Sequence, residues 1–289
     1  MHIVDIREAS VPLQGDIANA LVNFSEHTVS LVAIESDVIR NGRPVTGIAF
    51  NSIGRFAQPG LLRERFIPRI KACKSGALLD DDGRAFSASK VYHAAMANEK
   101  PGGHGDRAAA VAALELAVWD LNAKLADEPA YMCIARAAGR SLHVEPIPVY
   151  AAGGYYYPGD SLGRLRGELS RARDLGFVDY KIKIGGAPIA QDLERIEAAV
   201  TFAGGGHHVS VDANGRFDRA AALQYADAML AMQLRWLEEM GDPLDYALNA
   251  ELTRHYPHAV ATGENLFSTP DTVNLLRFGG LRPGLDILQ

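Results

Sequence analysis

The sequence predicts an α/β protein built from two domains: an α+β domain over residues 1–125 and a domain of repeated strand–helix units over residues 126–289. A chain of 289 residues is long enough for roughly two domains. Strand-like runs followed by helix-like stretches in the first half are typical of an α+β domain. In the second half, short apolar strands alternate with amphipathic stretches, which predicts parallel strands.

Three strand-like runs open the chain and alternate between apolar and polar residues, the pattern of half-buried strands. Asn41-Gly42, a dipeptide that favours tight hairpin turns, separates the second run from the third. We therefore expect an antiparallel meander, followed by helices of which the last is Ala-rich, Leu-spaced and free of internal Gly or Pro. The expected strands are residues 3–13, 28–36 and 45–52, and the expected helices are residues 60–75, 86–98 and 107–125.

The character of the sequence changes near Pro146, where strand–helix alternation begins. An open doubly wound sheet and a closed barrel both fit these units. No G-x-G-x-x-G follows the first strand, so a dinucleotide-binding fold has no positive support. The expected strands are residues 149–156, 180–186, 208–215, 235–241 and 259–265, and a sixth begins at residue 286.

Composition excludes several classes of partner. The formal net charge is −6 and no Lys/Arg-rich tract is present, so we expect no nucleic acid partner. We find no signal peptide, and no apolar stretch approaches the roughly 20 residues of a membrane helix, so we expect a cytoplasmic protein without a membrane segment. Cys73 and Cys133 are too few for a disulfide framework or a thiolate metal site, and we expect both to be reduced.

Three acids occupy matching places in three successive strand–helix units. The interval is 26 residues from Asp212 to Glu238 and again from Glu238 to Glu264, about the length of one unit. The acids are therefore expected at one level of neighbouring strands, near the C-terminal ends where β/α enzymes place their sites. Crowded carboxylates repel, and an all-oxygen ligand set favours Mg²⁺. The alternative is three separate acids that pair with Arg or cap helices. Glu239 is expected to point outward or toward a neighbouring strand.

Lys181 and Lys183 stand two residues apart on the expected strand one unit earlier, so both side chains face the same side. Burying two ammonium groups is costly, and a lysine whose pKa is lowered by a nearby cation suits a general base. The alternative is two surface lysines on an exposed edge. His104 is interpreted as a loop histidine before a helix, and His207-His208 as lying at the wrong end of a strand for chemistry.

The K-x-K strand followed by Asp, Glu and Glu on the next three strands resembles the enolase superfamily, in its mandelate racemase/muconate lactonizing enzyme-like branch. Such sites use a Lys or His base with Mg²⁺. The first half agrees, because an α+β unit ending in AALELAVWDLNAKLA is similar to that family's capping domain. Within the branch the chain resembles the D-tartrate dehydratases. The segments that carry this likeness are FNSIGR, NEKPGGHG, VYAAGGYYYPG, KIKIGGAPI, VDANGRF, EEMGDPLDYAL and ATGENLFS.

The resemblance implies an N-terminal capping domain and a (β/α)7β TIM-type barrel, of which this sequence holds about six strands. It implies Mg²⁺ held by Asp212, Glu238 and Glu264. Lys183 would take the α-proton of a 2,3-dihydroxy dicarboxylate, while Lys181 stays cationic, contacts the carboxylate and lowers the pKa of Lys183. An enediolate would then expel the β-hydroxyl as water, converting D-tartrate to oxaloacetate in a hydro-lyase reaction.

Five further residues are candidates for substrate binding by this resemblance: Asn51, Asn98, Lys100, Tyr155 and Tyr156. Ordinary loop or packing duty is the alternative for each. The family's general acid is a histidine on a later barrel strand, so we expect it beyond residue 289, either in a continuing chain or lost from a truncated and inactive one.

Two other functions stay open. One is a different acid-sugar dehydratase, racemase or cycloisomerase of the same superfamily, and the other is an inactive metal-binding relic. For the D-tartrate dehydratase and for the other enzymes of the superfamily, we expect a small-molecule dicarboxylate or acid-sugar substrate and a homo-oligomer.

Overall fold

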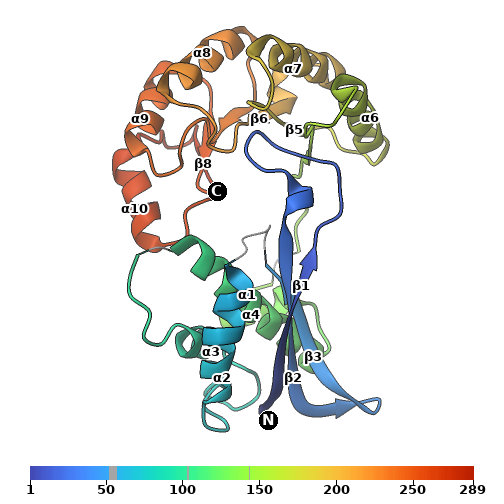
Figure 1. Ribbon diagram of the computed structural model, residues 1–289, viewed down its shortest axis with the longest axis vertical. Helices are drawn as coiled ribbons and strands as arrows, with labels where there is room; N and C mark the ends of the chain where they lie inside the picture. The colour runs from blue at the N-terminus through green and yellow to red at the C-terminus, as the bar shows by residue number, and fades with distance from the viewer. Residues whose placement is uncertain (52–56, 103, 143) are drawn as a thin grey trace. The chain divides into compact units, whose positions relative to one another are not determined.

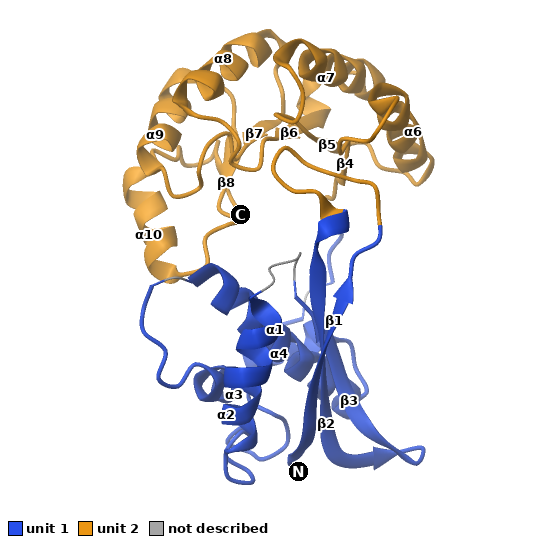
Figure 2. Cartoon of the chain, in the orientation of Figure 1, with its two compact units in different colours: residues 1–14, 25–146 blue, residues 15–24, 147–289 orange. Residues whose placement is uncertain are grey.

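A computed structural model describes residues 1–51, 57–102, 104–142 and 144–289. The chain divides into two compact units, Met1–Gln14 with Ser25–Pro146 and Gly15–Phe24 with Ile147–Gln289 (Figure 2). The first unit extends past the expected boundary at residue 125 because helix α5 (Ala130–Ala137) packs on α4 (His104–Ala126). The division falls instead at the change of sequence character near Pro146.

The first unit is a three-stranded antiparallel sheet with helices, as the sequence predicts. The strands are β1 (Ile3–Pro12), β2 (Thr28–Arg40) and β3 (Arg43–Phe50). Asn41 and Gly42 both have positive φ in the β2–β3 turn, which confirms the hairpin. The helices of the unit, besides α4 and α5, are α1 (Gln58–Leu61), a π-helical turn (Leu62–Phe66), α2 (Ile67–Lys71) and α3 (Ala88–Ala95).

The second unit is a six-stranded parallel sheet whose strands follow one another in sequence order, β4 to β9. Helices α6 to α10 line its outer side (Figure 1). Sequential strand order with helices on one side is the arrangement of a β/α barrel rather than a doubly wound sheet, which settles the alternative left open above. The strands are β4 (Ala151–Gly153), β5 (Tyr180–Lys183), β6 (Val209–Asp212), β7 (Trp236–Glu238), β8 (Val260–Thr262) and β9 (Ile287–Leu288). The helices are α6 (Ser161–Asp174), α7 (Ile189–Ala203), α8 (Arg219–Met229), α9 (Tyr246–His255) and α10 (Thr269–Phe278).

Alternation along the strands separates the apolar core from the polar face of this sheet. Ile182, Val211 and Leu237 are almost fully buried and belong to a core that includes Leu165 and Ile196 of the surrounding helices. Residues one position before and after them must point to the opposite, inner face. That face therefore receives both lysines of the K-x-K strand, as expected from their spacing. Among the described residues, no helix is long and apolar enough to cross a membrane.

Candidate functional site

The parallel register brings Lys183, Asp212 and Glu238 to one level of the inner face. Lys183 of β5 pairs with Asp212 of β6, and Asp212 pairs with Glu238 of β7. Each is the last residue of its strand, so the three side chains stand at the C-terminal edge of the sheet. Asp212 and Glu238 are fully buried, which requires that their charges be compensated within the site.

Glu264 reaches the other two acids by a route that the equal spacing did not predict. The register pairs Glu238 with Ala261, so Glu264 lies beyond the end of β8 rather than at the same level. Gly263 turns the chain there with a φ of +129°, a conformation that residues with a side chain rarely adopt. Ligand oxygens of Asp212, Glu238 and Glu264 nevertheless all lie within 4.8 Å of one another.

The two lysines compensate the two buried acids. Lys181 Nζ donates to Glu238 Oε1 at 2.5 Å and lies 3.7 Å from Asp212 Oδ2, while Lys183 Nζ donates to Asp212 Oδ2 at 2.5 Å. Burial favours the neutral form of Lys181, but the bond to Glu238 and the charges of both acids outweigh it and raise the pKa of Lys181. These contacts favour the charged form of Lys181.

Other donors complete the surroundings of the acids. Trp236 Nε1 donates to Glu238 Oε2 at 2.8 Å, so both oxygens of Glu238 have partners. The backbone amide of Asn214 donates to Asp212 Oδ1 at 2.8 Å, and its side chain lies 3.4 Å from Glu264 Oε1. These contacts orient the carboxylates toward a common point, which is the work of partners around a metal site.

Glu239 is a member of the site that the sequence did not identify. Its backbone adopts φ +40°, and its carboxylate is buried and accepts a hydrogen bond from Asn265 Nδ2 at 2.7 Å. It thus turns toward the end of the neighbouring strand, one of the two directions expected. Burial, and then the charges of Glu264 and the other acids, raises the pKa of Glu239 to about 8. The unusual φ breaks the strand alternation on which the sequence argument relied.

Of the two tyrosine candidates, Tyr155 lies at the site and Tyr156 lies behind it. The Tyr155 ring centroid is 5.6 Å from Lys183 Nζ, a cation–π distance. The Tyr156 hydroxyl instead donates to Asp192 Oδ1 at 2.5 Å, and burial together with that carboxylate raises the Tyr156 pKa. The Tyr156 hydroxyl therefore hydrogen-bonds within the protein interior.

The other three candidates lie in the first unit. Asn51 is buried, accepts from the Ser30 amide at 2.8 Å and donates to Gln58, and its role in substrate binding stays a prediction. Asn98 and Lys100 are exposed and remain predictions. The FNSIGR and NEKPGGHG segments include residues 52–55 and 103, which lie outside the described residues.

His104 and His208 have defined places in the secondary structure. His104 is the first residue of α4 rather than a loop residue before it. His208 belongs to a short 3-10 turn that precedes β6, and its Nδ1 lies 2.7 Å from Asp179 Oδ1. It is therefore at the N-terminal end of the strand whose opposite end carries Asp212, as expected.

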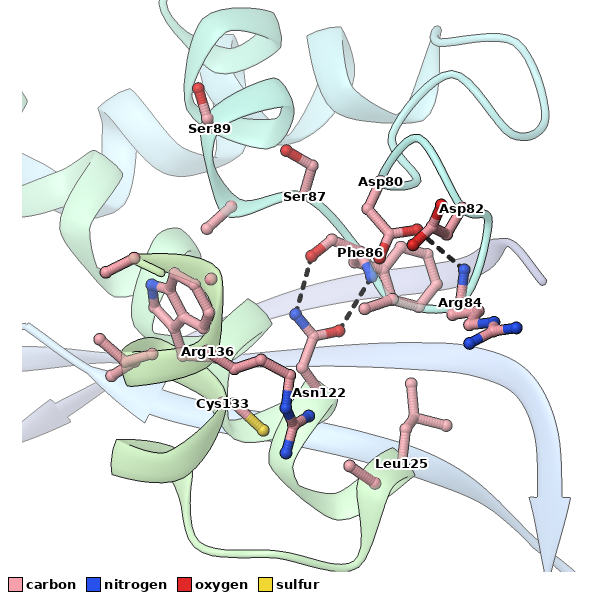
Figure 3. A pocket seen from close by; sticks show the side chains of 17 residues that line it. Asp80, Asp82, Arg84, Phe86, Ser87, Ser89, Asn122, Leu125, Cys133 and Arg136 are labelled. Atoms are coloured by element: carbon pink, nitrogen blue, oxygen red, sulfur yellow. Dashed lines mark hydrogen bonds between the residues drawn. The ribbon is translucent and has the colours of Figure 1, made fainter. Parts of the chain in front are cut away.

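The first unit also contains a cavity of about 980 Å³ between α4, α5 and the segment before α3 (Figure 3). The side-chain amide of Asn122 pairs with the backbone of Phe86 there: it accepts from the Phe86 amide at 2.9 Å and donates to the Phe86 carbonyl at 2.7 Å. Burial and the Glu128 carboxylate raise the pKa of the Cys133 thiol to about 11, which disfavours the thiolate form.

The triad fits a hard divalent cation by its donor chemistry. Three carboxylates converge, and partial burial followed by the charges of Asp212 and Glu238 raises the pKa of Glu264. A divalent cation relieves this repulsion, and oxygen ligands alone favour Mg²⁺ over Zn²⁺. The ammonium groups of Lys181 and Lys183 lie beside the same acids.

Comparisons with known proteins agree with this geometry. The model of the enolase C-terminal domain-like family matches residues 164–287. The 3,6-anhydro-alpha-L-galactonate cycloisomerase of Streptomyces coelicolor is 30% identical over 181 residues, 62% of this chain and 47% of that protein. The L-talarate/galactarate dehydratase of Salmonella typhimurium is 26% identical over 302 residues, 99% of this chain and 72% of that protein. The chain thus spans about half of the first relative's length and under three quarters of the second's.

Solved structures show the same fold. A mandelate racemase/muconate lactonizing enzyme-like protein from Rubrobacter xylanophilus superposes with a TM-score of 0.73 at 26% identity, covering 96% of this chain and 71% of that one. The Salmonella dehydratase, solved with Mg and L-lyxarohydroxamate, gives a TM-score of 0.73 at 24% identity, covering 96% of this chain and 68% of that one. Residues 164–287 therefore match the enolase C-terminal domain-like family, and the chain shares the fold of mandelate racemase/muconate lactonizing enzyme-like proteins.

Proposed function

We propose that this protein is a Mg²⁺-dependent hydro-lyase of acid sugars in which Lys183 abstracts the proton α to a carboxylate. The observation that carries the proposal is the shared register of Lys183, Asp212 and Glu238, which sets a lysine amine directly beside a carboxylate cluster suited to a metal. A proton acceptor next to a site for a carboxylate-binding cation is the arrangement that α-proton abstraction requires.

Asp212, Glu238 and Glu264 would hold the Mg²⁺, which when bound supplies a positive charge that stabilises the carboxylate as negative charge builds on it. Lys181 supports the same charge, because its raised pKa keeps it cationic. Lys183 takes the proton, and the Tyr155 ring beside its Nζ excludes water from one side. Lys181, Lys183 and Tyr155 would face a substrate carboxylate bound at the acids.

The substrate we propose is a 2,3-dihydroxy dicarboxylate, with D-tartrate first and oxaloacetate as its product. The sequence likeness of NEKPGGHG and GGYYYPG to the D-tartrate dehydratases supports this choice. The dehydratase relative supports the reaction class, and its own name states that it acts on the longer diacids talarate and galactarate. Those two diacids therefore belong in any test.

The test is to incubate the protein with Mg²⁺ in D₂O with a panel of acid sugars that includes the tartrate isomers, galactarate and talarate. Keto-acid formation measures dehydration, and loss of the α-proton signal by NMR measures abstraction separately. We expect both with D-tartrate. If neither signal appears with any member of the panel, the proposal is refuted. If only another acid sugar is dehydrated, the substrate is that acid sugar and not D-tartrate.

A second candidate is a cycloisomerase or racemase of the same superfamily. The 30% identity to a cycloisomerase over 181 residues favours keeping it. Exchange of an α-proton without loss of water would identify this alternative in the same experiment. A homo-oligomeric state also remains a proposal, and light scattering of the purified protein measures it.

A further inference from the structure

The first turns of α7 carry two charged side chains that are buried behind the site, Asp192 at 0% and Arg195 at 4% exposure. Burying charges is costly unless they are paired and hydrogen-bonded. We propose that Asp192 and Arg195 are positioning residues for Lys183, which they hold by fixing the chain on both sides of it. This inference rests on the proposed role of Lys183 as the base.

Asp192 fixes the chain that follows Lys183. Its Oδ2 accepts from the Gly185 amide at 2.7 Å and from the Tyr225 hydroxyl at 2.9 Å, and its Oδ1 accepts from the Tyr156 hydroxyl at 2.5 Å. Gly186 presses on the Tyr156 ring so closely that an added Cβ would lie 2.5 Å from it. The carboxylate thus anchors the backbone two residues after Lys183.

Arg195 fixes the chain that flanks Lys183 on the neighbouring strand. Its Nη2 donates to the Gly154 carbonyl at 2.5 Å, and the amide of Lys183 donates to that same carbonyl at 3.3 Å. The same Nη2 lies 3.4 Å from the carbonyl of Tyr155, whose ring covers the Lys183 ammonium. The guanidinium also lies 4.5 Å from the Tyr156 ring centroid, within cation–π distance.

The two side chains therefore hold the backbone on both sides of Lys183. Asp192 holds Gly185, and Arg195 holds the carbonyl that receives the Lys183 amide. Misplacing a reacting group by about 1 Å costs about 10²-fold in rate, so small movements of this backbone matter to the base. Neither side chain makes a hydrogen bond or ion pair with an acid of the triad in the described structure, so their loss should spare the metal site.

The experiment compares Asp192→Asn and Arg195→Lys with Glu194→Gln, an exposed site on the same helix, in the protein as purified with Mg²⁺. Asn replaces one acceptor oxygen with a donor group that faces the existing donors, and Lys cannot span both carbonyls. We expect kcat for α-proton exchange to fall about 10- to 100-fold, with KM and Mg²⁺ affinity close to those of the control. Tyr225→Phe removes one bond to Asp192 and serves as the milder variant if either of the others fails to fold.

A second readout does not depend on turnover. Backbone amide exchange of residues 181–187, followed by mass spectrometry, should quicken in the variants and not in the control. A wild-type-like kcat together with unchanged exchange protection would overturn the positioning role. A fall in kcat accompanied by an equal rise in KM and an equal fall in Mg²⁺ affinity would overturn it too. If the wild type turns over no acid sugar, the proposed function fails, and the amide exchange alone then decides the positioning role.

Discussion

Replacement of Lys183 by Met tests the base and the electrostatics of the site at once. General bases contribute about 10²- to 10⁴-fold to rate, so α-proton exchange should fall by at least that factor. The effect on Mg²⁺ follows from the 2.5 Å bond between Lys183 Nζ and Asp212 Oδ2, an oxygen of the metal triad. A cation held there binds against a like charge, and Lys183→Met removes that charge.

The magnitude can be bounded. Two unit charges about 4 Å apart interact by about 1 kcal/mol in water and about 4 kcal/mol near a protein surface. Mg²⁺ carries two unit charges, so its repulsion from one ammonium is about 2 to 8 kcal/mol; since about 1.4 kcal/mol is tenfold, Mg²⁺ should bind about 25-fold or more tightly to Lys183→Met. Isothermal titration calorimetry measures the affinity and NMR in D₂O measures the exchange, with exposed Lys74→Met as the control. Retained exchange would remove Lys183 as the base, and weaker Mg²⁺ binding would refute the electrostatic reasoning.

Three further predictions concern the supports of the site. Asn265→Ala removes the 2.7 Å bond to Glu239 and should weaken Mg²⁺ binding about 10-fold by calorimetry; an unchanged affinity would separate Glu239 from the metal site. Gly263→Ala imposes a side chain at φ +129° and should lower the free energy of unfolding by about 1–3 kcal/mol in urea, whereas an unaltered midpoint would contradict the strain. Burial opposes the Asp286 charge, but the bonds to Arg282 outweigh it and lower the Asp286 pKa. The pair therefore stabilises the folded protein above the unfolded pKa near 4, and this stability is lost as the pH falls through the folded pKa. Thermal unfolding of Arg282→Leu should therefore show a smaller drop in Tm below about pH 4 than the wild type.

Much of the fold was predictable because its signals are local. Period-two alternation and the Asn41-Gly42 turn predicted the antiparallel meander, and both are confirmed. The same alternation put Lys181 and Lys183 on one face, since side chains two apart on a strand always share a face. The choice between barrel and doubly wound sheet was beyond this reasoning, because strand order depends on contacts between distant segments.

Some features of the site also followed from the sequence, and others depended on the tertiary structure. The sequence by itself determined which residue types meet at the strand ends, including the Asp212 and Glu238 pair, because equal unit lengths place them in register. Only the tertiary structure decided how Glu264 reaches them past Gly263, that Glu239 turns toward Asn265 beyond the neighbouring strand, and that the Tyr156 hydroxyl donates to Asp192. Those outcomes depend on backbone angles and on bonds between residues far apart in the chain, which no local spacing encodes.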